Sequence, residues 1–234
     1  MSTVFIISAP SGSGKSTLVN ELRRLVPGLD FSISYTTRAP RGSEQNGREY
    51  YFIARAEFEC MIAGREFLEY ADVFGNAGVH GNYYGTARRF LVEAEEHGHD
   101  LLLDIDVQGA AQVKQKIPSA VSIFVLPPDR QKLEWRLNNR GLDSSDVIRR
   151  RLDTARREIE NYDKYDYILV NDRLEEATDE LRAIVLSERL RRSGGVPSED
   201  DQKKIYMAER CRLSNARTRI QPILDSFRSG EDQQ

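Results

Sequence analysis

The chain has 234 residues, a length that corresponds to one or two domains. Hydrophobic residues make up 39% and charged residues 30% of it, which fits a folded globular protein and excludes wholesale disorder. The formal net charge is −3, so we expect no general attraction to nucleic acid or to a membrane. No apolar run is long enough to cross a bilayer, and the N-terminus lacks the features of a signal peptide. With only two widely spaced cysteines, Cys60 and Cys211, we expect a cytoplasmic protein with neither a disulfide framework nor a zinc site.

The first predicted elements are a buried strand and a helix. Residues 3–8 form a short apolar run rich in β-formers, and residues 15–25 carry leucines at helical spacing. Between residues 30 and 86 the pattern changes to short β-like pieces and loops rich in glycine, arginine and tyrosine, with one helix predicted over 56–63. This stretch predicts a separate, mostly β insert.

From residue 87 onward, predicted helices and strands alternate. The helices cover 87–97, 108–116, 129–140, 144–160 and 173–192, and the strands cover 101–106, 120–126 and 166–170. Such alternation predicts an α/β fold with a parallel, doubly wound sheet and right-handed crossovers. The expected domains are a core of residues 1–33 and 87–192, an insert of residues 34–86, and a linker with a C-terminal helical extension over 193–234.

The C-terminal extension begins with the linker SGGVPSEDD and continues as a predicted helix over 202–228. Apolar residues recur there every three or four positions, and Pro222 is expected to kink or split the helix. The apolar stripe could dock on another subunit and make a homo-oligomer. The basic face could bind an acidic partner or nucleic acid, and a solvated or weakly packed helix is the simplest alternative.

The most specific motif lies between the first strand and the first helix, and reads Ala9-Pro10-Ser11-Gly12-Ser13-Gly14-Lys15-Ser16-Thr17. A glycine-rich turn presents backbone N–H groups to a phosphate, and the helix N-terminus adds its positive dipole. In such a loop Lys15 can reach the β- and γ-phosphates, and the Ser16 hydroxyl can ligate Mg²⁺. Ala9 stands where the strict pattern has glycine. The motif predicts a nucleoside triphosphate site without naming a reaction.

Other features narrow the class. The sequence lacks the NKxD signature of P-loop GTPases and is short for an ATP-driven motor. An insert at 30–86 and an arginine-rich helical pair at 130–157 indicate a kinase of small molecules, which must hold two phosphate-bearing substrates and exclude water.

Further segments make the match specific. They are Ser34-Tyr35-Thr36-Thr37-Arg38-Ala39-Pro40-Arg41, Gly47-Arg48-Glu49-Tyr50-Tyr51-Phe52, Glu66-Phe67-Leu68-Glu69-Tyr70, Tyr83-Tyr84-Gly85-Thr86 and Leu103-Asp104-Ile105-Asp106-Val107-Gln108-Gly109. With the phosphate loop, they closely resemble guanylate kinase of the bacterial type, a P-loop nucleoside monophosphate kinase, over about residues 3–190. The resemblance implies a parallel-sheet core, a GMP-binding insert and a helical lid at about 137–157. It also implies transfer of the γ-phosphate of ATP to GMP with Mg²⁺, which gives ADP and GDP in purine nucleotide metabolism and GMP recycling.

The resemblance assigns the guanine base to Glu69, with the hydroxyls of Ser34 and Thr86 beside it. Guanine presents N1–H and the N2 amino group side by side, so one carboxylate can accept from both. Adenine lacks paired donors on that edge and would leave a buried acid unsatisfied.

The resemblance assigns the GMP phosphate to Arg38, Arg41, Tyr50 and Tyr84. Arginine suits this role because its planar guanidinium can donate two hydrogen bonds to one phosphate. Asp104 is assigned to GMP. For Asp106 two roles stay open, near the Mg²⁺ ion or as the cap of the following helix.

The resemblance gives catalytic roles to Lys15 and to the lid arginines Arg136, Arg140 and Arg151, which would stabilise charge on the transferring phosphoryl group. Arg149 and Arg150 could compete for the lid role. Asn171 matches a residue near the adenine. The GMP phosphate is already an anionic nucleophile, so no histidine base is needed, and we expect His80, His97 and His99 at the surface.

The sequence departs from the family in the loop over residues 76–82 (NAGVHGN), which is longer than usual and is expected to extend a hairpin. Two other functions stay open. One is a guanylate-kinase-like binding module without catalysis, which intact Lys15, Arg38, Arg41, Glu69 and Asp104 disfavour. The other is a kinase for a different nucleotide or small acid.

Overall fold

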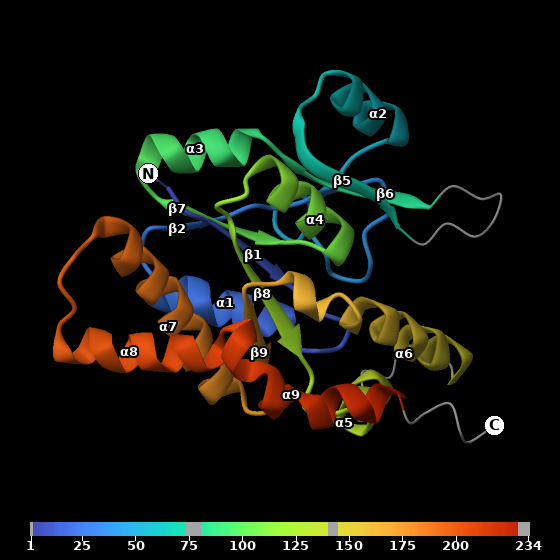
Figure 1. The fold of residues 1–234 in the computed structure, drawn as a ribbon. Coiled ribbons are helices and arrows are strands. Elements are labelled where there is room, and N and C mark those ends of the chain that lie inside the picture. The colour runs from blue at the N-terminus through green and yellow to red at the C-terminus, as the bar shows by residue number, and fades with distance from the viewer. Residues whose placement is uncertain (1, 74–80, 140–144, 229–234) are drawn as a thin grey trace. The chain divides into compact units, whose positions relative to one another are not determined.

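The computed structural model describes residues 2–73, 81–139 and 145–228 (Figure 1). The chain divides into two compact units. The first unit comprises Met1–Ile6 and Gly28–Val121, and the second comprises Ile7–Pro27 and Ser122–Gln234. The predicted order of helices and strands is confirmed, with boundaries that differ by one or two residues at most ends.

A five-stranded sheet has the order β2-β7-β1-β8-β9. Its strands are β1 (Val4–Ser8), β2 (Leu29–Phe31), β7 (Asp100–Asp104), β8 (Val121–Leu126) and β9 (Tyr167–Val170). In the first unit β2 runs parallel to β7, and in the second β8 runs parallel to β9. Every residue of β1 and of β8 is buried, as expected for strands covered on both faces. The α/β class with a parallel sheet is therefore confirmed.

The first unit also contains a four-stranded sheet in the order β4-β3-β6-β5. Its strands are β3 (Tyr35–Thr36), β4 (Tyr51–Phe52), β5 (Phe67–Val73) and β6 (Asn82–Ala87). Helix α2 (Arg55–Ala63) packs on this sheet through Phe58, whose ring stacks on Phe67 at 4.3 Å and on Tyr83 at 5.1 Å. Helix α3 (Arg89–His97) packs on β7, and α4 (Val107–Lys116) packs on β5.

The second unit places helices around β8 and β9. They are α1 (Lys15–Leu25), α5 (Arg130–Asn138), α6 (Ser145–Ile159), the short 3₁₀ turn η1 (Tyr162–Lys164) and α7 (Leu174–Ser193). Helix α1 packs on α7, and Leu18 and Leu22, two of the leucines at the spacing that predicted α1, are buried. Burial of such a face, rather than helix propensity alone, stabilises helices of this length.

The C-terminal extension forms two helices, α8 (Glu199–Cys211) and α9 (Leu213–Arg228). Helix α8 begins with a capping box between Ser198 and Asp201 and lies beside α7 (Figure 1). Pro222 lies inside α9 and does not split the predicted helix, which breaks at Arg212 instead. There the backbone is extended, forms a bridge with Tyr167 of β9, and lets the N–H of Leu213 donate to the carbonyl of Asp166 at 3.0 Å.

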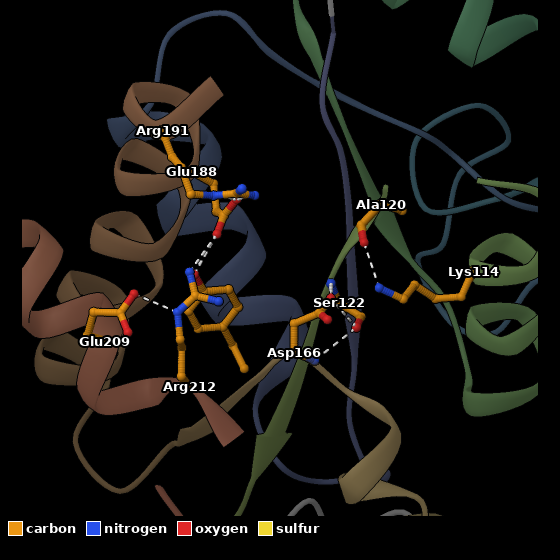
Figure 2. A network of polar contacts seen from close by, with 9 residues as sticks. Lys114, Ala120, Ser122, Asp166, Glu188, Arg191, Glu209 and Arg212 are labelled. Atoms are coloured by element: carbon orange, nitrogen blue, oxygen red, sulfur yellow. Dashed lines mark hydrogen bonds and ion pairs between the residues drawn. The ribbon is translucent and has the colours of Figure 1, made fainter. Parts of the chain in front are cut away.

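A network of polar side chains fastens this extension to the second unit (Figure 2). Glu188 of α7 is 2% exposed and accepts hydrogen bonds from the hydroxyl of Tyr167 at 2.6 Å and from Nη2 of Arg191 at 2.6 Å. Arg212, at the break between α8 and α9, donates a further bond to Glu188 at 3.3 Å and also pairs with Glu209. A buried carboxylate needs such partners to offset its desolvation.

The apolar stripe of α9 is buried against β9 and α5 of the same chain, with Ala216 and Ile220 at 0% exposure. The stripe is therefore covered within the second unit, and docking on another subunit would need a different face. Homo-oligomerisation stays a prediction. Across the described residues, no helix combines the length and the apolar character needed to cross a membrane.

Candidate nucleotide-binding sites

Glu69 lies on β5, opposite Thr86 of β6 in antiparallel register. Its side chain is 4% exposed, and one carboxylate oxygen accepts a hydrogen bond from the Thr86 hydroxyl at 2.7 Å. A Cβ atom at Gly109 would lie 2.5 Å from the other oxygen, so glycine lets α4 approach the acid. Burial raises the pKa of Glu69 to about 7, the Asp106 charge adds to the rise, and the Thr86 bond and Lys116 oppose it. The result is a buried carboxyl group, for which a change of partner has a large energetic effect.

Helix α4 also holds the strand on which Glu69 lies. Strand β5 is an edge of its sheet, so its outer backbone groups need other partners. Gln112 supplies them at Tyr70, donating to its carbonyl at 2.7 Å and accepting from its N–H at 3.3 Å. Lys116 donates to the carbonyl of Leu68. The two contacts flank Glu69 on both sides, and sequence reasoning did not identify Gln112 or Lys116.

A second cluster in the first unit surrounds Arg38, whose side chain is 9% exposed. Its guanidinium donates to the Tyr84 hydroxyl at 3.1 Å and to Glu44 at 3.0 Å, and lies 5.5 Å from the ring centre of Tyr50. Burial raises the pKa of Tyr50 to about 12, and the negative charge of Asp104 contributes. The structure therefore gathers four of the residues predicted for GMP: Arg38, Tyr50, Tyr84 and Asp104.

Glu44 is a member of this cluster that sequence reasoning missed. One of its oxygens accepts from Arg38 and the other accepts from the backbone N–H of Arg41 at 2.7 Å. The bond from Arg38 lowers the pKa of Glu44, while burial opposes that shift. The same loop also holds Glu49, so no local sequence pattern singles out Glu44.

The two clusters are linked by strand β6. Tyr84 and Thr86 are two residues apart, so they lie on the same face about 7 Å from each other. Asp106 caps α4 by accepting from the N–H of Gly109 at 2.8 Å, which is the capping role left open by the sequence. The structure gives the hydroxyl of Ser34 no hydrogen bond to these groups within the described part of the chain.

The phosphate loop belongs to the second unit. Gly12 and Gly14 have φ angles of 95° and 85°, the left-handed region that favours glycine. A Cβ atom would lie 2.9 Å from the side chains of Leu133 and Leu137 at position 12, and 2.4 Å from Asn171 at position 14. Helix α1 then begins with no side-chain cap and no acid in its first turn, so its N-terminus retains the positive potential that suits a phosphate.

Side chains distant in sequence converge on this loop. Asn171 is 5% exposed and donates to the carbonyl of Ser13 at 2.7 Å, and Arg136 donates to the Asn171 carbonyl at 2.9 Å. Burial lowers the pKa of the Arg136 guanidinium. Arg151 of α6 reaches the Ser11 hydroxyl at 2.6 Å. The loop thus gathers Arg136, Arg151 and Asn171, three of the residues predicted for the donor side. The Asn171 amide contacts the loop backbone, and the roles of all three toward ATP stay predictions.

The first turn of α1 carries Lys15 and Ser16, and Ser16 is exposed. Within the described part of the chain, the buried hydroxyl of Ser13 has no hydrogen-bond partner. This is an uncommon state for a buried polar atom. Arg140 and residues 76–80 of the long loop lie outside the described residues.

A strand, a glycine loop and a helix at the start of a parallel sheet define the class of P-loop nucleotide-binding proteins. The family model for guanylate kinase matches residues 1–188. The chain belongs to the guanylate kinase family.

Similar proteins support this assignment. A guanylate kinase of Koribacter versatilis is 60% identical over 99% of this chain and 98% of its own length. A guanylate kinase of Neisseria meningitidis is 52% identical over 81% of this chain and 90% of its own length. The crystal structure of guanylate kinase from Anaplasma phagocytophilum matches with a TM-score of 0.65 and 34% identity, covering 80% of this chain and 86% of that chain. The family model ends before the C-terminal extension, which the Koribacter relative matches.

Proposed function

We propose that this chain transfers the γ-phosphoryl group of ATP to GMP and releases ADP and GDP. The observation that carries the choice of GMP is Glu69, a carboxylate 4% exposed and held by Thr86 on one side and by α4 on the other. Guanine N1–H and N2–H would donate to this carboxylate together. A base without that pair of donors would leave the acid buried and unpaired, which costs roughly 1–3 kcal/mol or more.

The GMP phosphate would lie against Arg38, Arg41, Tyr50 and Tyr84, with Asp104 and Ser34 as further GMP contacts. Arg38 is aligned by Glu44 and by the Tyr84 hydroxyl, so its fork is oriented before the ligand arrives. Such preorganisation reduces the entropy lost on binding.

On the donor side, the backbone of residues 9–17 and the N-terminus of α1 would hold the phosphates of ATP. Lys15, Arg136, Arg140 and Arg151 would stabilise negative charge on the transferring group, and Asn171 would lie near the adenine. An oxygen of the GMP phosphate attacks the γ-phosphorus while the bond to the bridging β–γ oxygen breaks, so both the nucleophile and the leaving group are phosphate oxygens and no side-chain base is required.

Mg²⁺ fits this donor set because hard oxygen ligands suit it, and the Ser16 hydroxyl is exposed on the first turn of α1. Asp106 is a further candidate ligand, although one of its oxygens already caps α4. The ion would neutralise phosphate charge. We also propose a cytoplasmic location, where the two free cysteines, Cys60 and Cys211, would stay reduced.

The decisive experiment compares nucleoside monophosphates as acceptors with Mg-ATP, following ADP release. GMP should give by far the highest kcat/KM, and AMP and UMP should be poor acceptors. A preference for AMP, UMP or a non-nucleotide acid would contradict the proposal, and no turnover with any acceptor would favour a binding module.

A further inference from the structure

Two of the chain's three histidines meet at one carboxylate in the first unit, in a cluster that the kinase chemistry does not use. Nδ1 of His99 lies 2.9 Å from one oxygen of Asp30, and Nδ1 of His97 lies 3.2 Å from the other. The two imidazole rings are 5.6 Å apart between centres. The expected surface positions of His97 and His99 are confirmed, since their side chains are 61% and 42% exposed.

The backbone fixes each of these residues separately. Asp30 lies in β2, and its neighbour Leu29 pairs with Asp100 of β7. His97 is the last residue of α3. Gly98 then adopts a left-handed φ of 68°, which turns the chain so that His99 comes next to the same strand. The N–H of His99 donates to the carbonyl of Ala94 at 2.9 Å. The convergence therefore follows from a helix cap and a strand register.

The donor atoms have the spacing and chemistry of a metal site. One ligand atom from each residue lies within 4.8 Å of the others. Donors bound to a tetrahedral zinc ion at about 2.0–2.1 Å are roughly 3.3 Å apart, so small side-chain movements would close the site. Two imidazoles and one carboxylate favour zinc or a similar transition ion, whereas Mg²⁺ and Ca²⁺ prefer oxygen ligands.

We propose that Asp30, His97 and His99 form a three-ligand site for a divalent transition ion of the zinc type, with water completing the coordination. The ion would bind through both Nδ1 atoms and the carboxylate, in place of the His–Asp contacts. It would join β2, which precedes the insert of residues 34–86, to the end of α3, which follows that insert. Its effect is to stabilise the first unit, and it is separate from the Mg²⁺ that accompanies ATP.

The test uses the full chain, freed of metal with a chelator and titrated with zinc in the absence of nucleotide. Calorimetry should show saturable binding of one ion per chain, and the unfolding temperature should rise with zinc concentration. Cobalt titrated in place of zinc should give the visible absorption bands of a four- or five-coordinate ion.

The variants identify the ligands. His99→Gln alone should weaken zinc binding at least about tenfold, since even loss of an outer-shell partner commonly has that effect. The double change His97→Gln with His99→Gln should abolish it, and Asp30→Asn should weaken it while leaving the two imidazoles in place. ATP:GMP turnover should stay unchanged in the histidine variants.

Two matched controls complete the design. His80→Gln removes the remaining histidine, and Cys60→Ser removes the exposed thiol, which is the alternative soft ligand. Both should bind zinc as the unmodified chain does. Absence of saturable binding, equal binding by the double histidine variant, or binding lost only with Cys60→Ser would each overturn the proposal, and the cluster would then be a pair of His–Asp contacts only.

Discussion

On the function proposed above, the choice of acceptor depends on the carboxylate of Glu69. Replacing it with glutamine keeps an acceptor for the Thr86 hydroxyl but removes the charge and one of the two acceptor oxygens. We expect Glu69→Gln to raise the KM for GMP by about 10- to 100-fold and to leave the KM for ATP nearly unchanged. Steady-state kinetics with each substrate varied in turn measures both. Glu66→Gln, an exposed acid next to the same strand, is the control, and an unchanged GMP preference in Glu69→Gln would contradict the base assignment.

Because the pKa of Glu69 is raised, we expect folding stability and GMP binding to depend on pH in opposite directions. Below about pH 7 the folded protein holds this acid protonated, whereas the ordinary value is 4.5. Between those values the folded state carries an extra proton, so stability declines as pH rises through 7, by up to about 3 kcal/mol. GMP needs the ionised form, so its KM should fall over the same range.

Denaturant unfolding at pH 5 to 8, with and without Glu69→Gln, checks the stability effect. The variant should show the smaller decline, because glutamine does not titrate. Parallel declines in both proteins would assign the pH dependence to other groups.

At this scale the sequence predicted which residues gather around Arg38 but not the residues that hold them in place. Arg38, Tyr50 and Tyr84 carry recognisable motif positions, and the structure brings them together. Glu44 escaped prediction because its role depends on a loop folding back on Arg38, and no local pattern encodes that contact.

Among the elements, helix α4 is expected to affect acceptor binding indirectly, through its contacts with β5. Gln112 replaces a missing neighbour strand along β5, so Gln112→Ala should loosen the strand that presents Glu69. We expect the KM for GMP to rise several-fold, while the KM for ATP changes little. Gln115→Ala, exposed on the same helix, is the matched control. A fall in kcat with no change in the KM for GMP would contradict a positioning role.

The phosphate loop offers a test of close packing against backbone strain. Gly14 and Gly98 both have positive φ, but only Gly14 faces a neighbour, Asn171, within reach of a Cβ atom. In both alanine variants the free energy of unfolding should fall by about 1 kcal/mol, because alanine is strained at a positive φ. Gly14→Ala should in addition raise the KM for ATP, because the loop must shift, whereas Gly98→Ala should not. An equal KM for ATP in the two variants would contradict a role of this loop in ATP binding.

The elements themselves were largely predictable, because apolar spacing directly reports which faces are buried. The prediction failed at the break in the C-terminal helices. Pro222 is tolerated inside α9, while the chain opens at Arg212, where it pairs with Tyr167. A backbone bridge between residues 45 positions apart leaves no mark in local sequence.

At the scale of the whole molecule, the Glu188 network determines how firmly the extension is held. Glu188→Gln keeps the bond to Tyr167 but removes the charge that faces Arg191 and Arg212. Since those arginines are 61% and 33% exposed, we expect a loss of about 2 kcal/mol rather than the full cost of breaking a buried pair. Chemical denaturation measures it. The control is Glu176→Gln, which breaks an exposed ion pair with Arg173 at the start of the same helix. It should change the free energy of unfolding by less than about 0.5 kcal/mol. Similar losses in both variants would contradict a special role for Glu188.

The placement of α9 has a consequence for biosynthesis. The residues of α9 that cover β9 follow that strand in the chain, so the nascent chain must present a partly uncovered apolar strand until α9 has been made. The second unit can close only after α9 has left the exit tunnel. Premature termination just before α9 should therefore yield a product prone to aggregation and to capture by chaperones, even though the phosphate loop and the GMP motifs have already been synthesised.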